Sequence, residues 1–135
     1  MKKIIIYSDG GARGNPGPAG IGCVLKDESG HNVAEIYKYI GETTNNQAEY
    51  RAILFGVEKA KDMGAEEIDC YLDSELVVKQ LNREYKVKNK DLAPLFTKIY
   101  NLSMGFKKVK FTHIRRELNS EADSLANKAM DEKLN

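Results

Sequence analysis

The sequence predicts an α/β fold in one domain, with a mixed five-stranded sheet flanked by helices. The chain has 135 residues, of which 41% are hydrophobic, and this is the size of one ordinary domain. Short β-branched runs that end at glycine or aspartate predict strands, and longer segments with apolar residues at helical spacing predict helices. Their order over residues 1–135 is β-β-β-α-β-α-α-β-α, which is typical of a sheet with antiparallel and parallel pairs.

The first three strands are expected to form an antiparallel meander. The run Lys3–Tyr7 is apolar and β-branched, and the strand is expected to stop at Asp9. Glycines and prolines over residues 10–20 predict a loop. The chain returns as a strand at Ile21–Leu25, and the alternating pattern of Val33–Ile40 predicts the third strand.

Two helices are preceded by the sequence of a capping box, in which two side chains three residues apart bind backbone N–H groups at the helix start. Thr44 and Gln47 have this spacing ahead of a helical pattern that is expected to end near Gly64. Ser120 and Asp123 have the same spacing at the start of the last helix. Both helix starts are therefore predicted from the cap as well as from periodicity.

The segment between these two helices is predicted to contain two strands and two further helices. Ile68–Leu72 reads as a strand, after which Asp73 or Ser74 can cap a short helix. Apolar residues over Leu92–Leu102 recur at helical spacing, and the alternation over Val109–His113 predicts the fifth strand.

The composition favours a protein of a reducing compartment. Cys23 and Cys70 lie inside apolar runs and lack the spacing of a zinc site or of a disulfide framework. The apolar run Ile4–Tyr7 is too short for a signal peptide or a membrane span. We therefore expect a cytoplasmic protein with no membrane association, and the sequence indicates no obligate protein partner.

The net charge of +1 hides a basic middle segment. Residues 79–116 carry 11 basic and two acidic side chains, whereas residues 1–78 and 117–135 are net acidic. Such a run forms either a solvated surface or a stripe that follows the phosphates of a nucleic acid.

Four carboxylates are expected to meet at one edge of the sheet, although each has an ordinary role when taken alone. Two of them follow strands, one lies on the helix face that must pack on the sheet, and one lies near the start of the last helix. Together they repel one another unless a divalent cation lies among them, and oxygen ligands select Mg²⁺ or Mn²⁺. Two such ions about 3.5–4 Å apart can hold the attacking and leaving oxygens of a displacement at phosphorus. The four acids are Asp9, Glu49, Asp73 and Asp123.

The motifs around these acids closely resemble those of type 1 ribonuclease H, in the same order and over nearly the whole chain. The resemblance implies a ribonuclease H-like domain that uses two Mg²⁺ ions, or Mn²⁺, to hydrolyse the RNA strand of an RNA–DNA hybrid, with the four acids as catalytic and metal-binding residues. Double-stranded RNA is a further candidate partner. The matching segments are Tyr7-Ser8-Asp9-Gly10-Gly11, Gly14-Asn15-Pro16-Gly17-Pro18, Thr43 to Glu49, Leu72-Asp73-Ser74, and Asn119 to Ala126.

The resemblance also implies substrate contacts. Asn15 and Asn45 match residues that touch the RNA strand in the minor groove, where the 2′-hydroxyls are displayed. Thr44 and Asn89 match a pocket for a phosphate of the DNA strand, but both can equally be ordinary capping and turn residues. The other positions implied to bind substrate are Gly10, Gly11, Asn46 and Ser74.

The chain departs from the family pattern at a catalytic loop, where many members have a histidine before the last aspartate. His113 lies at the usual distance without a gap, but its alternation with Phe111 predicts that it ends a strand and packs there. With a shorter loop, Arg116 takes this place and would act electrostatically as a catalytic residue. The other interpretation of Arg116 is a surface arginine paired with Glu117 or Glu121.

The family's tryptophan-rich basic handle is also missing, although four cations remain between residues 82 and 90. The main alternative function is a module that binds hybrids or double-stranded RNA without cutting them, and it does not require all four acids. Actin-like ATPases also begin with a strand and Asp-Gly, but they need two copies of such a domain. The cations are Arg83, Lys86, Lys88 and Lys90.

Overall fold

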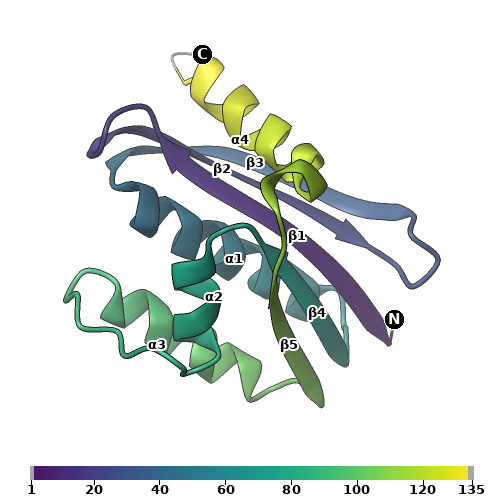
Figure 1. Cartoon of the computed structure of the whole chain (residues 1–135). Helices are drawn as coiled ribbons and strands as arrows, with labels where there is room; N and C mark the ends of the chain where they lie inside the picture. The colour runs from purple at the N-terminus through teal and green to yellow at the C-terminus, as the bar shows by residue number, and fades with distance from the viewer. Residues whose placement is uncertain (1, 134–135) are drawn as a thin grey trace.

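The computed structural model describes residues 2–133, which form one five-stranded sheet with helices on both faces (Figure 1). The order of strands and helices is the predicted one, with one additional short 3-10 turn before the last helix. The elements are β1 (Lys3–Ala12), β2 (Gly17–Lys26), β3 (Asn32–Thr43), α1 (Asn45–Asp62), β4 (Glu67–Leu72), α2 (Glu75–Leu81), α3 (Ala93–Ser103), β5 (Lys108–His113), the 3-10 turn Arg116–Leu118 and α4 (Ser120–Asp131).

The sheet has the strand order β3-β2-β1-β4-β5, with β1 at its centre. β2 pairs antiparallel with both β1 and β3, which confirms the predicted meander. β4 pairs parallel with both β1 and β5. The carboxyl ends of β1 and β4 therefore lie at the same edge of the sheet.

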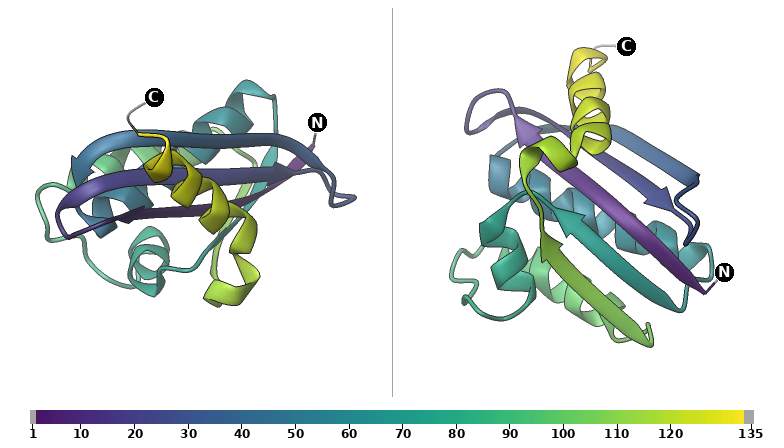
Figure 2. Two further views of the ribbon diagram at one scale, coloured as in Figure 1. Left: turned by 90° about the horizontal axis from the view of Figure 1, so that it is seen from above. Right: turned by 45° about the vertical axis from the view of Figure 1, so that its right-hand side comes forward.

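The helices form two unequal layers (Figure 2). α1, α2 and α3 cover one face, and α4 alone crosses β1, β2 and β3 on the other. The main core lies between the sheet and α1, where Ile6 of β1, Ile53 and Val57 of α1 and Ile68 of β4 are fully buried. Among the described helices, none combines the length and apolar character that a bilayer span requires.

β1 and β2 are longer than predicted, because the glycines of residues 10–20 lie mostly inside strands. A side chain at Gly10 would overlap the backbone of Ala48 in α1. On the opposite face, a Cβ at Gly20 would lie 2.7 Å from the carbonyl oxygen of Ala126 in α4. These glycines let helices approach the sheet closely, whereas the sequence pattern had predicted a loop.

Two of the predicted caps are present. Thr44 Oγ1 accepts a hydrogen bond from the backbone N–H of Gln47 at 3.2 Å. The Gln47 side chain binds the hydroxyl of Thr43 instead of closing the box. Of the two candidate caps for α2, Ser74 is the one that accepts a bond from a backbone N–H, that of Val77, at 3.3 Å.

The predicted capping box at Ser120 and Asp123 is wrong. Ser120 is already the first residue of α4, and Asn119 is its N-cap. The backbone N–H of Asp123 donates to the Asn119 carbonyl at 3.0 Å. The start of α4 is thus fixed by the residue before Ser120, and the Asp123 carboxylate has no part in a capping box.

Candidate metal and active site

The candidate site lies where β1 and β4 separate. Their parallel pairing ends at Ser8 and Leu72, so Asp9 and Asp73 are the next residue of each chain segment. β1 does not stop there as predicted, but continues beside β2 to Ala12. The sheet therefore opens between β1 and β4, and both carboxylates lie at this opening.

α1 supplies the third carboxylate. Glu49 lies near the amino end of the helix, one residue after Ala48, whose backbone rests against Gly10. Single carboxylate oxygens of Asp9, Glu49 and Asp73 all lie within 4.8 Å of one another. An all-oxygen donor set at this spacing suits a hard divalent cation such as Mg²⁺ or Mn²⁺.

The fourth acid approaches from the other face of the sheet. Asp123, in the first turn of α4, lies beside Asp9, adds to the raised pKa of that carboxyl, and lines the same cavity of about 530 Å³ as the other three acids. The structure thus brings all four predicted acids together, with Asp123 beside Asp9 and outside the tight group of three.

Two carboxyl groups of the cluster, Asp9 and Glu49, have pKa values well above their ordinary range. Burial raises the pKa of Asp9 to about 8, and the negative charge of Asp73 adds to the shift. Burial also raises the pKa of Glu49 to about 7, although a hydrogen bond from Ser74 and the charge of Arg116 oppose this. Without a cation, the site therefore disfavours the fully ionised state.

Asn119 has a role in the site that the sequence pattern does not indicate. It is 1% exposed, and its Nδ2 donates to the Ser8 carbonyl at 2.8 Å and to Asp73 Oδ2 at 3.2 Å. Because Asn119 is also the N-cap of α4, it ties the start of that helix to β1 and orients Asp73. The only sequence signal was its position in the motif that contains Asp123.

The structure separates the two candidates for the catalytic loop position. Arg116 lines the cavity of the four acids, and its charge acts on Glu49. In residues 2–133 it takes part in none of the ion pairs, whereas the neighbouring Arg115 lies 3.7 Å from Glu117. His113 ends β5 as predicted, but it is exposed, so the prediction that it packs there is wrong. The reason is its place at the end of an edge strand.

Several predicted substrate-binding residues lie beside the acids. Gly10, Gly11 and Asn45 line the same cavity. Asn15 is adjacent, since its Oδ1 accepts a hydrogen bond from the Asn45 backbone N–H at 3.1 Å. Asn45 Oδ1 in turn accepts one from the backbone N–H of Ala12 at 2.8 Å. The turn after β1 and the start of α1 are therefore held together next to the cavity.

Other predicted contacts have structural roles that are visible in the chain itself. Thr44 and Ser74 cap helices, and Ser74 also reaches Glu49. Asn89 Oδ1 accepts a hydrogen bond from the backbone N–H of Asp91 at 2.7 Å, which is the pattern of a turn. Asn46 is exposed in the first turn of α1.

Comparison with known proteins gives consistent matches. The family model described as "Reverse transcriptase-like" matches residues 7–129. Over 130 residues, 96% of this chain, the sequence is 43% identical to a bifunctional protein of Mycobacterium tuberculosis and 42% identical to ribonuclease HI of Halobacterium salinarum. The chain spans 36% and 65% of the length of these two curated relatives.

Solved structures extend the similarity to three dimensions. LC11-RNase H1, isolated from compost, has been solved in complex with an RNA/DNA hybrid. It superimposes with a TM-score of 0.93 at 47% identity, over 98% of this chain and 99% of that chain.

The raised pKa values predict how stability depends on pH without metal. In the unfolded chain Asp9 and Glu49 titrate near 3.8 and 4.5, and in the folded protein near 8 and 7. Between about pH 4 and about pH 8 the folded protein therefore holds protons that the unfolded chain has released, so its stability falls as the pH rises. Urea unfolding in EDTA across this range should show the fall.

Two variants make this measurement specific. Asp9→Asn should make stability depend less on pH, because it removes the carboxyl with the most strongly raised pKa. Asp62→Asn, at the exposed far end of α1, should leave it unchanged. An Asp9→Asn variant with the original pH slope would show that the cluster does not cause it.

Proposed function

Because the chain belongs to the ribonuclease H family, we propose that it hydrolyses the RNA strand of RNA–DNA hybrids. The observation that carries this proposal is the convergence of Asp9, Glu49 and Asp73, with oxygens within 4.8 Å of one another, beside Asp123. The likeness to LC11-RNase H1, whose structure contains an RNA/DNA hybrid, supports the choice of substrate.

The residues present fit two Mg²⁺ ions, with Mn²⁺ as the alternative. Four carboxylates supply only oxygen ligands, and burial makes their full ionisation costly, a cost that bound cations would offset. Bound at this site, the ions would activate water and stabilise the charge that develops on the phosphate.

The chain's own residues prepare the site for this chemistry. Asn119 holds Asp73 in place through its bond to Oδ2, so the carboxylate is oriented before substrate arrives. Arg116 places a positive charge next to Glu49 inside the cavity. A guanidinium stays protonated, so Arg116 would act by attracting a phosphate oxygen and not by proton transfer.

Recognition of the hybrid would use the rim around Asn15 and Asn45. Both asparagines lie at the junction between the β1–β2 turn and α1, where amide groups could contact the 2′-hydroxyls of RNA. A phosphate of the DNA strand would lie near Thr44 and Asn89. The remaining proposed contacts are Gly10, Gly11, Asn46 and Ser74.

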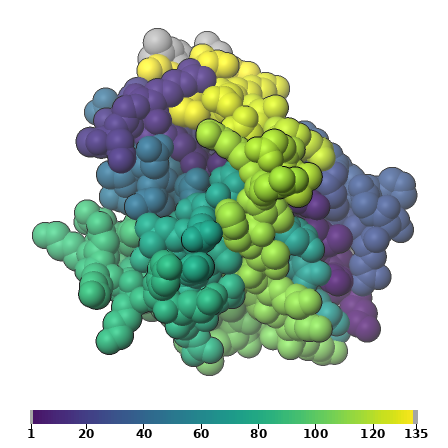
Figure 3. All heavy atoms as spheres, in the orientation of Figure 1, coloured from purple at the N-terminus to yellow at the C-terminus, as the bar shows by residue number. Residues whose placement is uncertain are grey.

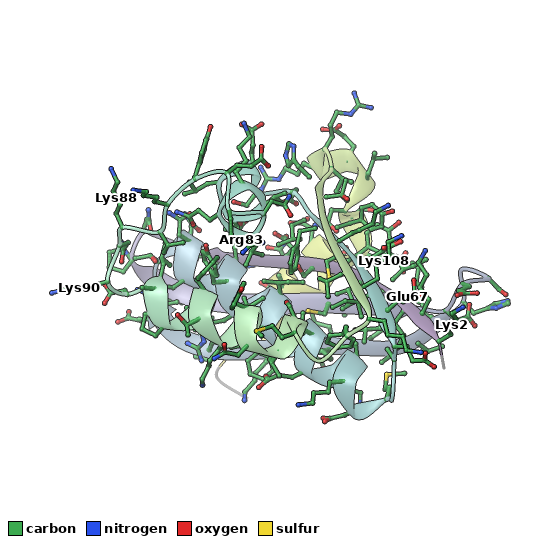
Figure 4. The ribbon with its side chains drawn as sticks, turned by 90° about the horizontal axis from the view of Figure 1, so that it is seen from below. Lys2, Glu67, Arg83, Lys88, Lys90 and Lys108 are labelled. Carbon is green, nitrogen blue, oxygen red and sulfur yellow. The ribbon has the colours of Figure 1, made fainter. Side chains whose placement is uncertain are left out.

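The structure divides the basic middle segment into separate groups. Lys88 and Lys90 project from the loop between α2 and α3, whereas Lys108 lies toward the other end of the molecule beside Glu67 (Figure 4). Lys107 is paired with Glu66 at 2.6 Å. We infer that the loop cations, and not the whole segment, add electrostatic affinity for the hybrid.

Asp73→Asn tests the role of the acids. It keeps the shape of the side chain and its contact with Asn119 but removes a negative charge, so cleavage of a labelled hybrid should fall to background while the melting temperature stays equal or rises. Asp62→Asn is the matched control and should cleave normally. Full activity of Asp73→Asn at saturating Mg²⁺ would exclude Asp73 from the catalytic site. If the wild-type protein bound the hybrid without cutting it, the protein would be a binding module.

Neutralising the loop cations tests their contribution. Replacing Lys86, Lys88 and Lys90 by glutamine should raise KM and weaken its salt dependence, with less effect on kcat, because these side chains would meet phosphates in any sequence. The control triple variant replaces exposed lysines in the last turn of α1, far from the acids, and on α3. Its KM should depend on salt as that of the wild type does. An unchanged slope in the first variant would make the loop an ordinary solvated surface. The control lysines are Lys59, Lys61 and Lys98.

Arg116 and His113 should respond differently to alanine substitution. Arg116→Ala should lower kcat by roughly ten- to a hundredfold with little change in stability, because one charge contact with the transition state is lost. His113→Ala should retain kcat, since the side chain is exposed at the end of β5. Steady-state cleavage and thermal unfolding check both, and the reverse pattern would assign the catalytic loop position to His113.

A further inference from the structure

The cavity of the four acids continues well past the metal-binding group. From Asp123 it follows α4 to Asn127 and Met130, and its far wall is formed by Arg13 from the turn between β1 and β2. Arg13 and Arg116 are the two cations among the described residues that line it. Because any nucleic acid strand that crosses the acids is itself negatively charged, the placement of these two cations matters for binding.

The two arginines lie on opposite sides of the acids along α4. Asp123, Asn127 and Asp131 are spaced by four residues, so they share one face of the helix. Arg116 precedes the helix, and Arg13 reaches its last turns, about 12 Å from Asp123 at 1.5 Å per residue. A strand with its cleaved phosphate at the acids would therefore have a cation on each flank.

The Arg13 guanidinium is held toward this cavity by two contacts with α4. Its Nη1 lies 2.7 Å from Asp131 Oδ1, and its Nη2 lies 3.4 Å from Asn127 Oδ1. The backbone is also fixed, since Arg13 N–H donates to the Pro18 carbonyl at 2.8 Å and a side chain at Gly17 would overlap the Arg13 carbonyl. The turn lies against α4 in the space-filling view (Figure 3).

The contact with Asp131 is weak enough to be exchanged for a phosphate. The side chains of Arg13 and Asp131 are 47% and 65% exposed. Ion pairs between exposed side chains contribute little to stability, whereas a guanidinium can bind a phosphate with two parallel hydrogen bonds. Asp131 thus orients the Arg13 guanidinium in an ion pair that a phosphate can replace.

We propose that Arg13 binds a phosphate of the RNA strand within two nucleotides of the cleaved one, on the side opposite Arg116. This rests on the proposed function, since the RNA strand is the one that must reach the acids. Arg13 acts in binding, so its loss is expected in KM and not in kcat.

Cleavage kinetics of four proteins test the proposal. Arg13→Ala should raise KM for the hybrid roughly tenfold with kcat within about twofold of wild type, the scale of one charged hydrogen-bonded contact, and Arg13→Lys should restore part of the loss. Arg115→Ala is the control, because Arg115 is an exposed arginine that does not line the cavity. Its KM and kcat should match those of the wild type. Equal KM values for Arg13→Ala and wild type would overturn the proposal.

Asp131→Asn separates binding from a structural role of the turn. It breaks the same ion pair but leaves the cation, so its KM should stay near or below the wild-type value. If Asp131→Asn raised KM as much as Arg13→Ala, the ion pair would be structural and the proposal would be wrong.

Hybrids with a single neutral methylphosphonate identify the phosphate. Neutralising the one that Arg13 binds should raise the wild-type KM about as much as Arg13→Ala does, and should cause no further increase in that variant. If each methylphosphonate near the cleavage point raised KM in Arg13→Ala as much as in the wild type, the assignment would be wrong. It would also be wrong if only methylphosphonates in the DNA strand raised KM. A wild-type protein that neither binds nor cleaves the hybrid would instead refute the proposed function, and this inference with it.

Discussion

The mutual repulsion of buried carboxylates at the opening between β1 and β4 is the constraint on which the rest of the structure depends. Asp9 and Asp73 lie there because two parallel strands end together, and Glu49 is brought in from α1. Burial and neighbouring negative charge raise the pKa of Asp9 to about 8, so ionising this carboxyl is unfavourable without a cation. The surrounding fold must supply enough packing to hold these groups in place.

That packing depends on glycines in β1 and β2. Gly10 allows the first turn of α1 to rest directly on β1, and Gly20 and Gly22 allow α4 to rest on β2 from the other face. Each close approach brings a carboxylate-bearing helix to the sheet edge. Asn119 completes the arrangement, because one amide group connects the start of α4 to β1 and to Asp73.

The sequence was sufficient to predict the order of elements, because hydrophobic periodicity is a local signal. It also predicted that the four acids meet, although Asp9 lies inside β1 and not at its end. It was misleading for residues 10–20, where glycine indicates either a turn or a close contact, and only the positions of α1 and α4 decide between them. The same limit applies to the start of α4, where the spacing of Ser120 and Asp123 predicted a capping box, whereas Asn119 is the N-cap. The exposure of His113 likewise depends on β5 being an edge strand, which is a property of the whole sheet.

The position of α4 has a consequence for folding. It is the last described element in the chain and stands alone on its face of the sheet, yet it carries Asp123 and is capped by the residue that orients Asp73. A partly folded chain in which the sheet and α1 have formed but α4 is undocked therefore has the main core without a complete acidic cluster. Detachment of this single helix is a local opening that would disassemble the site while leaving that core intact, so amide exchange in α4 would report on the integrity of the site independently of global unfolding.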